Sequence, residues 1–403
     1  MTSRKGRVQT AIKRLARVSY GLGQPPRLSA EGVPIIRATN ISDGRIDKEN
    51  LIFAAMSDLP LDRAPLLNYG EILVVRSGAC TGDSAMVTHA WVGSAPGYDL
   101  RVTPRSADPR FLAYALRSLP VRGQINLARS RAAQPHLNAE ELGEISIEVP
   151  DIDEQRRIAD FLDAENRKVD ALISRKRTLL SLLDEKINSR ILEYIGVSPL
   201  VDKSDAAIPV VPLRKLLSKL VRPAMPVKEV VTAFRDGQVT ARSKRRAEGF
   251  TLPSDAEPQG QFVEAGDVVI HGLDGFAGAI GTSESSGNCS PVYHVCVPCE
   301  GGNALFLGRL LRVLAVSGYL GLFATSTRER AVDFRNWNLF GRIPVPDVPP
   351  QLQEEIGEWI SFGRPLRVAV ERSFALAEER RQALITAAVT GQIDVTTARG
   401  VEV

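Results

Sequence analysis

Two stretches of this chain decide its fold, "EQRRIADFLD" at Glu154–Asp163 and "LQEEIGEWI" at Leu352–Ile360, each a few residues after a Val-Pro pair. Ile158 in the first stretch aligns with Ile356 in the second, 198 residues later in a chain of 403. A spacing of about half the chain indicates an internal duplication. A duplicated chain predicts two similar binding surfaces at a fixed distance, which suits a long ligand with two sites, such as duplex DNA.

The first stretch opens a predicted helix from Glu154 to Ile195, a segment of 42 residues that contains neither proline nor glycine. Its apolar residues recur at steps of three, four or seven, which is typical of an amphipathic helix, and Gly196 ends it. Such a helix is about 63 Å long at about 1.5 Å per residue. Because its apolar face is narrow, it needs a partner helix.

The second stretch opens a similar helix, predicted from Gln351 to Thr390 and ended by Gly391. Gly363 and Pro365 predict a break or kink inside it. The two helices are expected to pack as an antiparallel coiled coil if a pseudo-twofold axis relates the two halves of the chain. The residues expected to pair the helices or to bind a partner are Ile158, Leu162, Leu172, Leu179, Leu183, Ile187, Ile356, Trp359, Val370, Phe374 and Leu384.

A glycine-rich block with short β-like runs precedes each helix. In the first block "YGEILVVRSG" (Tyr69–Gly78) predicts a strand and a turn, and "EAGDVVIHG" (Glu264–Gly272) occupies the same place in the second. The predicted class is α+β, with two pseudo-symmetric mixed α/β domains separated by the two long helices. The expected boundaries are a first domain at 1–150, a central helix at 151–196, a connector at 197–210, a second domain at 211–346, a distal helix at 347–395 and a tail at 396–403.

Composition narrows the class of protein. Hydrophobic content of 44% and charged content of 24% are ordinary for a globular chain. Four cysteines are too few for a disulfide framework and indicate a reducing cytoplasm, and no 18-residue apolar run predicts a membrane span. The net charge of +4 does not by itself indicate nucleic acid, but basic residues cluster at 4–17 and at 235–246. Such clusters can contact phosphates or form a solvated surface.

Basic residues at turns are the candidates for DNA contact. An arginine in a turn can reach a guanine edge with two hydrogen bonds or bind a phosphate, and the alternative for each is a surface salt bridge. The candidate DNA-binding residues are Arg76, Ser77, Arg129, Arg131, His136, Arg235, Arg242, Lys244, Arg245, Arg246, His271, Arg328 and Arg330.

Sequence signatures of catalysis are weak. "LDGFAGAIG" (Leu273–Gly281) imitates the glycine motif of S-adenosylmethionine methyltransferases, but its second glycine arrives one residue late and the partner tetrad is absent. No P-loop motif is present, and no histidine lies in a recognisable nucleophile motif. Zinc could use the spacing of Cys289, His294, Cys296 and Cys299, but buried strand residues show the same spacing, and the sequence leaves this open. We assign no catalytic residue and no metal site from the sequence.

The chain resembles the specificity subunit of type I restriction–modification systems, and the likeness covers nearly its whole length. Four stretches carry it: "GEILVVRSG" (Gly70–Gly78), "QPHLNAEELGEISIEVPDIDEQRRIADFLD" (Gln134–Asp163), "VDALISRKRTLLSLLDEKI" (Val169–Ile187) and "ERRQALITAAVTGQIDV" (Glu379–Val395). The resemblance implies two target-recognition domains that each read one half of a bipartite DNA sequence. It also implies that the helix pair fixes the spacer between the two half-sites.

The resemblance further implies a subunit without catalysis of its own. Two modification subunits, which carry the methyltransferase chemistry and bind S-adenosylmethionine, would dock on this chain. The restriction or translocase subunits would join them, and this chain would bind no cofactor. It would act on double-stranded DNA in the cytoplasm, away from any membrane.

Two other classes of function stay open at the level of sequence. One is a self-sufficient DNA methyltransferase or nuclease with an unrecognised active site, which would transfer methyl groups or cut DNA without a partner. The other is a coiled-coil scaffold that does not touch nucleic acid, for which the basic cluster at 235–246 would be irrelevant to DNA affinity.

Overall fold

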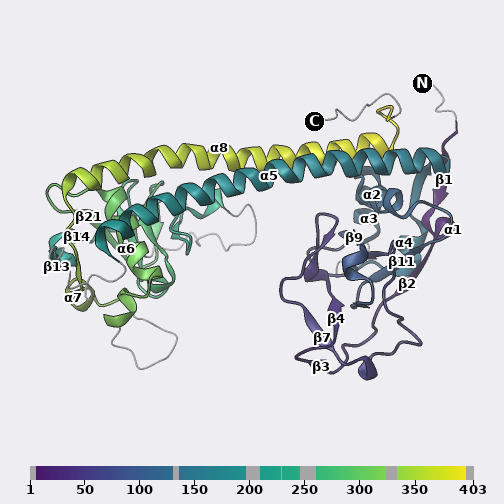
Figure 1. Cartoon of the computed structure of the whole chain (residues 1–403), viewed down its shortest axis with the longest axis horizontal. Coiled ribbons are helices and arrows are strands. Elements are labelled where there is room, and N and C mark those ends of the chain that lie inside the picture. The colour runs from purple at the N-terminus through teal and green to yellow at the C-terminus, as the bar shows by residue number, and fades with distance from the viewer. Residues whose placement is uncertain are drawn as a thin grey trace. The chain divides into compact units, whose positions relative to one another are not determined.

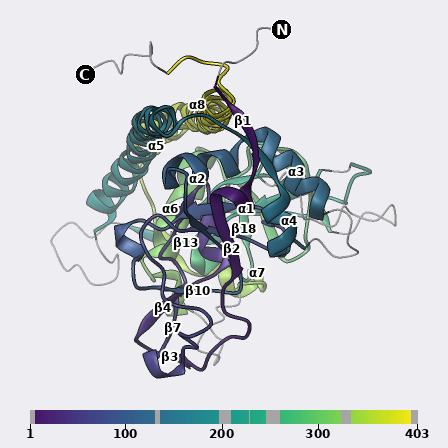
Figure 2. The same ribbon diagram turned by 90° about the vertical axis from the view of Figure 1, so that its right-hand side faces the viewer.

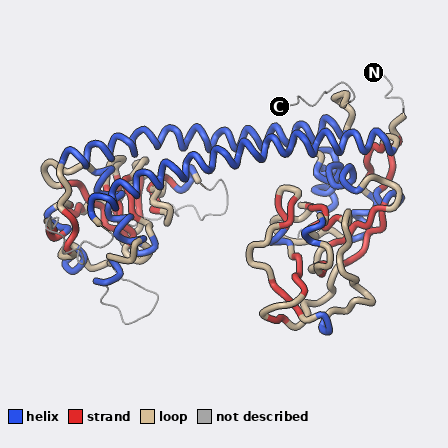
Figure 3. The backbone as a smooth tube through the Cα atoms, viewed as in Figure 1, coloured by secondary structure: helices blue, strands red, loops and turns tan. Residues whose placement is uncertain are grey.

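The computed structural model describes residues 6–129, 136–196, 209–227, 229–245, 260–323 and 334–395. The chain divides into two compact units (Figures 1 and 3). Unit 1 comprises Met1–Arg175 and Arg372–Val403, and unit 2 comprises Lys176–Glu371. Over the described parts of the chain, no helix combines the length and the apolar character that crossing a membrane requires.

Unit 1 is built on a four-stranded antiparallel sheet in the order β2-β11-β8-β9. A two-stranded ribbon, β1-β12, and a second sheet in the order β10-β4-β7-β3 accompany it, together with the short hairpin β5-β6. The strands are β1 (Val8–Ala11), β2 (Ala16–Tyr20), β3 (Leu28–Ser29), β4 (Val33–Ile36), β5 (Ile41–Ser42), β6 (Arg45–Ile46), β7 (Ile52–Ala54), β8 (Ile72–Val74), β9 (Ser84–Met86), β10 (Ala95–Pro96), β11 (Leu100–Pro104) and β12 (Ser146–Val149).

The helices of unit 1 cover one face of that sheet. Phe111 and Leu112 of α2 are fully buried between Ile72 of the sheet and Ile158 of the long helix α5, so one apolar core joins sheet, short helix and long helix. Figure 2, in which the unit 1 side faces the viewer, shows α2 next to the long helices. The short helices are α1 (Ile12–Leu15), α2 (Pro109–Arg117), α3 (Leu119–Arg129) and α4 (Ala139–Glu144).

Unit 2 repeats this plan. Its main sheet has the order β14-β21-β18-β19, strand for strand the counterpart of the first, and β13-β22 is the counterpart of β1-β12. Two small hairpin-like pairs, β15-β16 and β17-β20, replace the second sheet of unit 1. The elements are β13 (Val210–Pro212), β14 (Leu217–Leu220), β15 (Val231–Ala233), β16 (Val239–Ala241), β17 (Gln261–Val263), β18 (Val268–His271), β19 (Ile280–Thr282), β20 (Gly287–Cys289), β21 (Tyr293–Pro298), β22 (Pro344–Pro346), α6 (Ala304–Val316) and α7 (Trp337–Phe340).

The duplication extends to a glutamine near the start of each long helix. Gln155 accepts a hydrogen bond from the backbone N–H of Asp108 (2.9 Å), the residue that caps α2. Gln353 accepts the equivalent bond from the N–H of Asn303 (3.0 Å), which caps α6. Both glutamines are buried. The same side chain therefore ties the short helix to the long helix in each unit.

A buried carboxylate marks the start of the central strand in both units. Glu71 accepts hydrogen bonds from the Asn68 N–H, from Arg101 Nε and from Thr103 Oγ1, each at 2.8 Å. At the matching position in unit 2, Asp267 accepts one from the Glu264 N–H at 2.7 Å and pairs with an arginine from a neighbouring segment. These turns explain why the repeated Gly-Glu and Gly-Asp pairs are detectable in the sequence.

The two long helices are α5 (Ile152–Ile195, 44 residues) and α8 (Pro350–Val389, 40 residues). In unit 1 the start of α5 packs against the end of α8, where Ile158 and Ile385 share a core. In unit 2 the end of α5 packs against the start of α8, where Ile187 and Ile356 share another. In each unit the helices therefore pair antiparallel, as the repeat predicts.

The expected break at Gly363 and Pro365 is wrong, because α8 continues through both residues. A Cβ on Gly363 would lie 3.0 Å from Leu183 Cδ2, so the glycine allows close approach of α5 and does not end the helix. Pro365 lies on the exposed side of α8. Its missing N–H removes one helical hydrogen bond, which packing on the other side of the helix offsets.

Most residues expected to pair the helices are buried or partly buried: Ile158, Leu162, Leu183, Ile187, Ile356, Trp359, Val370, Phe374 and Leu384. Leu172 and Leu179 are instead 46% and 49% exposed, so their expected place in the helix pair is corrected. The buried positions in this part of α5 are Val169 and Ile173. Because successive helix residues point about 100° apart, a seam through Val169 and Ile173 turns Leu172 and Leu179 toward solvent.

Candidate nucleic-acid interface

One end of the main sheet of unit 1 gathers three side chains that lie far apart in the sequence. Leu100, the first residue of β11, pairs with Tyr20 at the end of β2 and with Val74 at the end of β8. The chain leaves β8 toward Arg76 and enters β11 from Tyr98. Strand register therefore places Tyr20, Arg76 and Tyr98 together at one end of the strands, here called the sheet edge.

At this edge the Arg76 guanidinium lies between two aromatic rings. Its Cζ atom is 4.7 Å from the ring centre of Tyr20 and 4.3 Å from that of Tyr98. The two tyrosines are about half exposed, at 46% and 49%. Two cation–π contacts restrict the orientation of the guanidinium.

A histidine completes this cluster. Arg76 donates a hydrogen bond to His136 Nε2 at 2.7 Å, and Ser77 forms a β-bridge with His136. A guanidinium has donors only, so Nε2 must be the acceptor and the ring proton is on Nδ1. Three of the predicted residues, Arg76, Ser77 and His136, are thus brought together.

Hydrogen bonds to its backbone hold the turn that carries Arg76. The Arg76 N–H donates to Asp99 Oδ1 (3.1 Å), and the Leu137 N–H donates to the Arg76 carbonyl (2.8 Å). Burial raises the pKa of Asp99, and the bond from the Arg76 backbone opposes that shift. The backbone at Arg76 is therefore bonded on both sides and its side chain starts from a defined position.

In unit 2 the position equivalent to Arg76 is Gly272. Its carbonyl accepts from the Phe334 N–H (2.8 Å), as the Arg76 carbonyl accepts from Leu137. A Cβ at Gly272 would lie 2.5 Å from the Val292 carbonyl oxygen, so no side chain fits there. The polar group at this edge is supplied by the preceding residue, His271, which ends β18.

His271 lies against Tyr293, the first residue of β21, with ring centres 4.6 Å apart. Its Nδ1 accepts from the N–H groups of Leu273 (3.1 Å) and Asp274 (3.0 Å). Asp274 also pairs with Arg235 at 3.0 Å, and the Arg235 side chain is 70% exposed. Burial lowers the pKa of His271 although the Asp274 carboxylate opposes this shift. Unit 2 therefore presents a neutral imidazole beside an exposed arginine.

The remaining basic residues of this region are each held by a neighbour. Arg242 donates to Thr232 Oγ1 (3.2 Å) and Lys244 to Ser285 Oγ (3.0 Å). Arg245 pairs with Asp236 at 2.9 Å and covers the ring of Phe234 at 4.1 Å. The Arg129 side chain and Arg131, Arg246, Arg328 and Arg330 lie outside the described residues.

The family comparison matches the segment of the chain that carries the Arg76 cluster. Residues 27–180 match the model of the type I restriction modification DNA specificity domain. The match covers 154 of the 403 residues, so this part of the chain is similar to that domain. The matched segment contains Arg76, Tyr98 and His136 and extends into α5.

A solved structure from a type I restriction–modification system has a similar fold, and two further solved structures match with lower scores. A structure described as "Structural basis underlying complex assembly and conformational transition of the type I R-M system" is 16% identical, covers 98% of this chain and 100% of that chain, and has a TM-score of 0.53. The HsdS subunit from Thermoanaerobacter tengcongensis is 14% identical over 98% of this chain and 99% of that one, with a TM-score of 0.43. The S subunit from M. genitalium is 15% identical over 96% and 97%, with a TM-score of 0.46. No curated protein sequence matches the chain.

The methyltransferase-like glycines of this chain serve a turn. Gly278 has a φ of 94°, and its counterpart Gly82 has a φ of 95°, a region that favours glycine. A Cβ on Gly278 would lie 2.7 Å from the Arg235 carbonyl oxygen. The segment Leu273–Gly281 is therefore the unit 2 copy of a turn that unit 1 also has.

The cysteines that could have bound zinc lie in different apolar cores. Cys289 packs with Val231 and Val263, whereas Cys296 packs with Leu310. Burial raises the pKa of Cys289 to about 12 and also raises the pKa of Cys296, so both remain thiols. His294 Nε2 bonds to the Phe334 carbonyl at 2.6 Å. Among the described residues no group of three His, Cys, Asp or Glu side chains could hold a metal ion.

The sequence did not point to the tyrosines that lie beside the predicted basic residues. Tyr20, Tyr98 and Tyr293 flank the predicted basic residues only because strands β2, β11 and β21 pair with the central strands. One signal was available, since each repeat has a tyrosine close to the start of the strand that pairs with its central strand, Tyr98 before β11 and Tyr293 at the start of β21.

Proposed function

We propose that each unit reads one half of a bipartite duplex target through the sheet edge described above. The observation that carries the proposal is a shared arrangement of a polar side chain and an aromatic ring at corresponding ends of the two main sheets. Arg76, just after β8, lies over Tyr98, which precedes β11, and His271, the last residue of β18, lies against Tyr293, the first residue of β21.

The Arg76 edge suits direct readout of a guanine. A guanidinium fork donates two hydrogen bonds to guanine O6 and N7 in the major groove, and such a pair discriminates by about 1–3 kcal/mol. The stacked tyrosines reduce the freedom that the side chain would lose on binding. Ser77 and His136 lie at the same edge and can contact phosphate or a neighbouring base.

The His271 edge suits a different half-site. Its Nδ1 is occupied by two backbone N–H groups, which leaves Nε2 as the group for a base edge or a phosphate. Arg235, Arg242, Lys244 and Arg245 would supply phosphate contacts around it. The two edges therefore differ in chemistry although they share a scaffold.

The long helices would set the spacer and bind the modification subunits. A helix of 44 residues is about 66 Å long at about 1.5 Å per residue, enough to span roughly 19 base pairs at about 3.4 Å each. Two modification subunits would carry S-adenosylmethionine and the methyl-transfer chemistry, and this chain would bind no cofactor. Restriction or translocase subunits would join them, and the assembly would act in the cytoplasm, where chromosomal DNA is accessible.

The test is a footprint of this chain assembled with its modification partner on a methylated target. We expect two protected blocks separated by an unprotected spacer. Arg76→Ala should weaken one block and His271→Ala the other, while Arg63→Ala, at an exposed arginine of unit 1, should change neither. A single contiguous block would contradict the bipartite reading. Methyl transfer by the chain without a partner would support the self-sufficient enzyme instead.

A further inference from the structure

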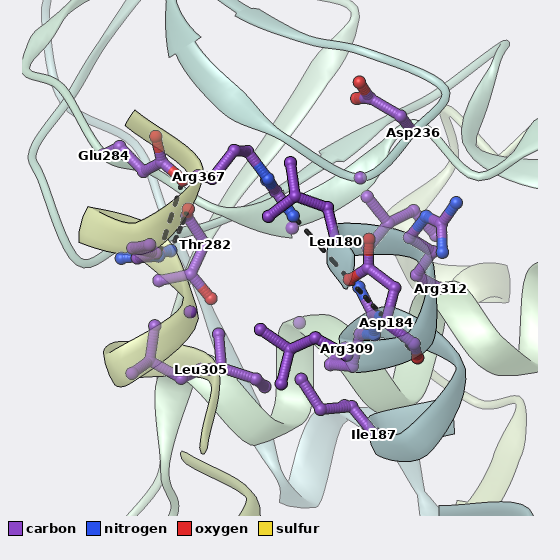
Figure 4. A pocket seen from close by; sticks show the side chains of 18 residues that line it. Leu180, Asp184, Ile187, Asp236, Thr282, Glu284, Leu305, Arg309, Arg312 and Arg367 are labelled. Carbon is purple, nitrogen blue, oxygen red and sulfur yellow. Dashed lines mark hydrogen bonds and ion pairs between the residues drawn. The ribbon is translucent and has the colours of Figure 1, made fainter. Parts of the chain in front are cut away.

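A small cavity in unit 2 lies where α5, α6, α8 and β19 meet (Figure 4). Its volume is about 60 Å³. A site for one water needs about 10–15 Å³ by the same measure, so this cavity has room for about four or five water-sized groups. Leu183, Ile187 and Leu305 form its apolar part, and charged side chains form the rest.

Two arginines of this cavity pair with one carboxylate, and a third lies beside them. Arg309 pairs with Asp184 at 2.9 Å and also donates to Asn188 Oδ1 at 2.9 Å, while Arg367 lies 3.7 Å from the same carboxylate. Figure 4 shows Arg309, Arg312 and Arg367 gathered around Asp184. One negative charge cannot neutralise three guanidinium groups.

Arg312 is the arginine whose charge is least compensated. Its guanidinium makes one long hydrogen bond, 3.5 Å to the Arg235 carbonyl, and its buried Nε has no partner among the described residues. Burial lowers the pKa of Arg312 and the neighbouring Arg309 charge lowers it further, while Asp184 and Asp236 only partly oppose this shift. A Cβ on Gly237 would collide with the Arg312 side chain, so this glycine makes the room in which Arg312 lies.

The opposite wall adds a fourth arginine. Arg364 donates to the Thr282 carbonyl at 2.7 Å and lies 3.5 Å from Glu284. Burial also lowers the pKa of Arg364. Asp236, the third acid at the cavity, is already paired with Arg245 at 2.9 Å. Four guanidinium groups thus face two carboxylates that are free to neutralise them.

We infer that this cavity binds a free tetrahedral oxyanion, phosphate or sulfate, between Arg312 and Arg367. Desolvated cations are costly unless an anion compensates them, and the planar donor fork of arginine fits phosphate oxygens. The space admits four oxygens around one centre but not a nucleoside. The inference concerns the stability of unit 2 and does not depend on how the chain reads DNA.

The test is calorimetric titration of the full chain with inorganic phosphate in chloride buffer at constant ionic strength. We expect saturable binding at one site per chain. Arg312→Gln should lower the affinity at least tenfold. Asp184→Asn should raise it, because Asp184 competes with the anion for the same arginines. Arg342→Gln, at an exposed arginine of unit 2 outside the cavity, should leave it unchanged.

The sign of the Asp184→Asn effect separates a binding site from a structural cluster, because a variant that merely loosened the fold would weaken binding. Sulfate should compete with phosphate, and adenosine monophosphate should not. The absence of saturable binding, equal affinity in Arg312→Gln, or tighter binding of adenosine monophosphate than of phosphate would each overturn the inference.

Discussion

Removing one tyrosine from the Arg76 cluster should reduce DNA affinity only because the Arg76 guanidinium loses a supporting ring. Tyr98→Leu keeps an apolar side chain at the sheet edge but removes the ring that lies 4.3 Å from the guanidinium. The Tyr20 ring at 4.7 Å remains. Arg76 then keeps its bond to His136 but loses support on one face.

The magnitude follows from the exposure of the rings. A cation–π contact at a partly exposed site contributes about 0.5–1 kcal/mol, so Tyr98→Leu should weaken binding of the cognate site by about two- to fivefold. Loss of both rings should cost about 1–2 kcal/mol. Arg76→Ala removes the reading group itself and should cost about 1–3 kcal/mol, mostly for targets that carry the guanine it contacts.

The assay is fluorescence anisotropy of the complex with its modification partner, on cognate and single-substituted duplexes at fixed salt. The variants Arg76→Ala and Tyr98→Leu and their combination form a double-mutant cycle. We expect the Tyr98 effect to vanish once Arg76 is absent. Tyr293→Leu, the same change in unit 2, should add to Arg76→Ala without coupling.

Full additivity of Tyr98→Leu and Arg76→Ala would refute the reasoning, because it would mean that the ring acts on something other than the guanidinium. Equal loss of affinity on every duplex would refute base reading by Arg76 and leave a phosphate contact. Loss of a phosphate contact lowers the salt dependence of binding by about one unit, which a salt titration of Arg76→Ala detects.

Three further changes test other parts of the structure. Pro365→Ala should raise the free energy of unfolding by about 1–3 kcal/mol, since the residue is exposed and a proline inside a helix removes a hydrogen bond; urea unfolding measures this. Leu172→Gln with Leu179→Gln should change stability by less than about 0.5 kcal/mol but impair assembly with the modification subunit in size-exclusion chromatography. Burial lowers the pKa of His294 below 6.5, so unit 2 should lose stability as pH falls below about 6.5. Unfolding midpoints measured between pH 8 and 5 test this, and His294→Leu should flatten their dependence on pH.

The elements that the sequence predicted best are those defined by a local pattern. The run from Glu154 has an unbroken helical period, and α5 begins only two residues earlier, at Ile152, and ends at the predicted Ile195. The Gly-Glu and Gly-Asp turns likewise precede the predicted strands, because the glycine at each needs a positive φ (82° at Gly70, 100° at Gly266).

The predictions that failed depend on what lies opposite in space. Gly363 has the composition of a helix break, but it faces Leu183 of α5 and gives the two helices room to approach. Leu172 fits a heptad as well as Ile173 does, and only the position of the partner helix selects Ile173 for burial. Arg76 was predicted from its turn, whereas Tyr20 and Tyr98 reach it through strand pairing that a single sequence does not encode locally.

The two repeats differ where packing leaves them free to differ. The Gln155 and Gln353 clamps and the Glu71 and Asp267 turns hold the helix–sheet core, and changing them would leave buried polar groups without partners. The sheet edge carries no such constraint. In unit 1 the polar residue at this edge is Arg76. In unit 2 the Val292 carbonyl excludes any side chain at Gly272, and the polar side chain at this edge is that of His271. The Arg76 guanidinium has several N–H donors, whereas the His271 ring, whose Nδ1 accepts two backbone N–H groups, has only its Nε2–H, so the two ends differ in how many hydrogen bonds they can donate.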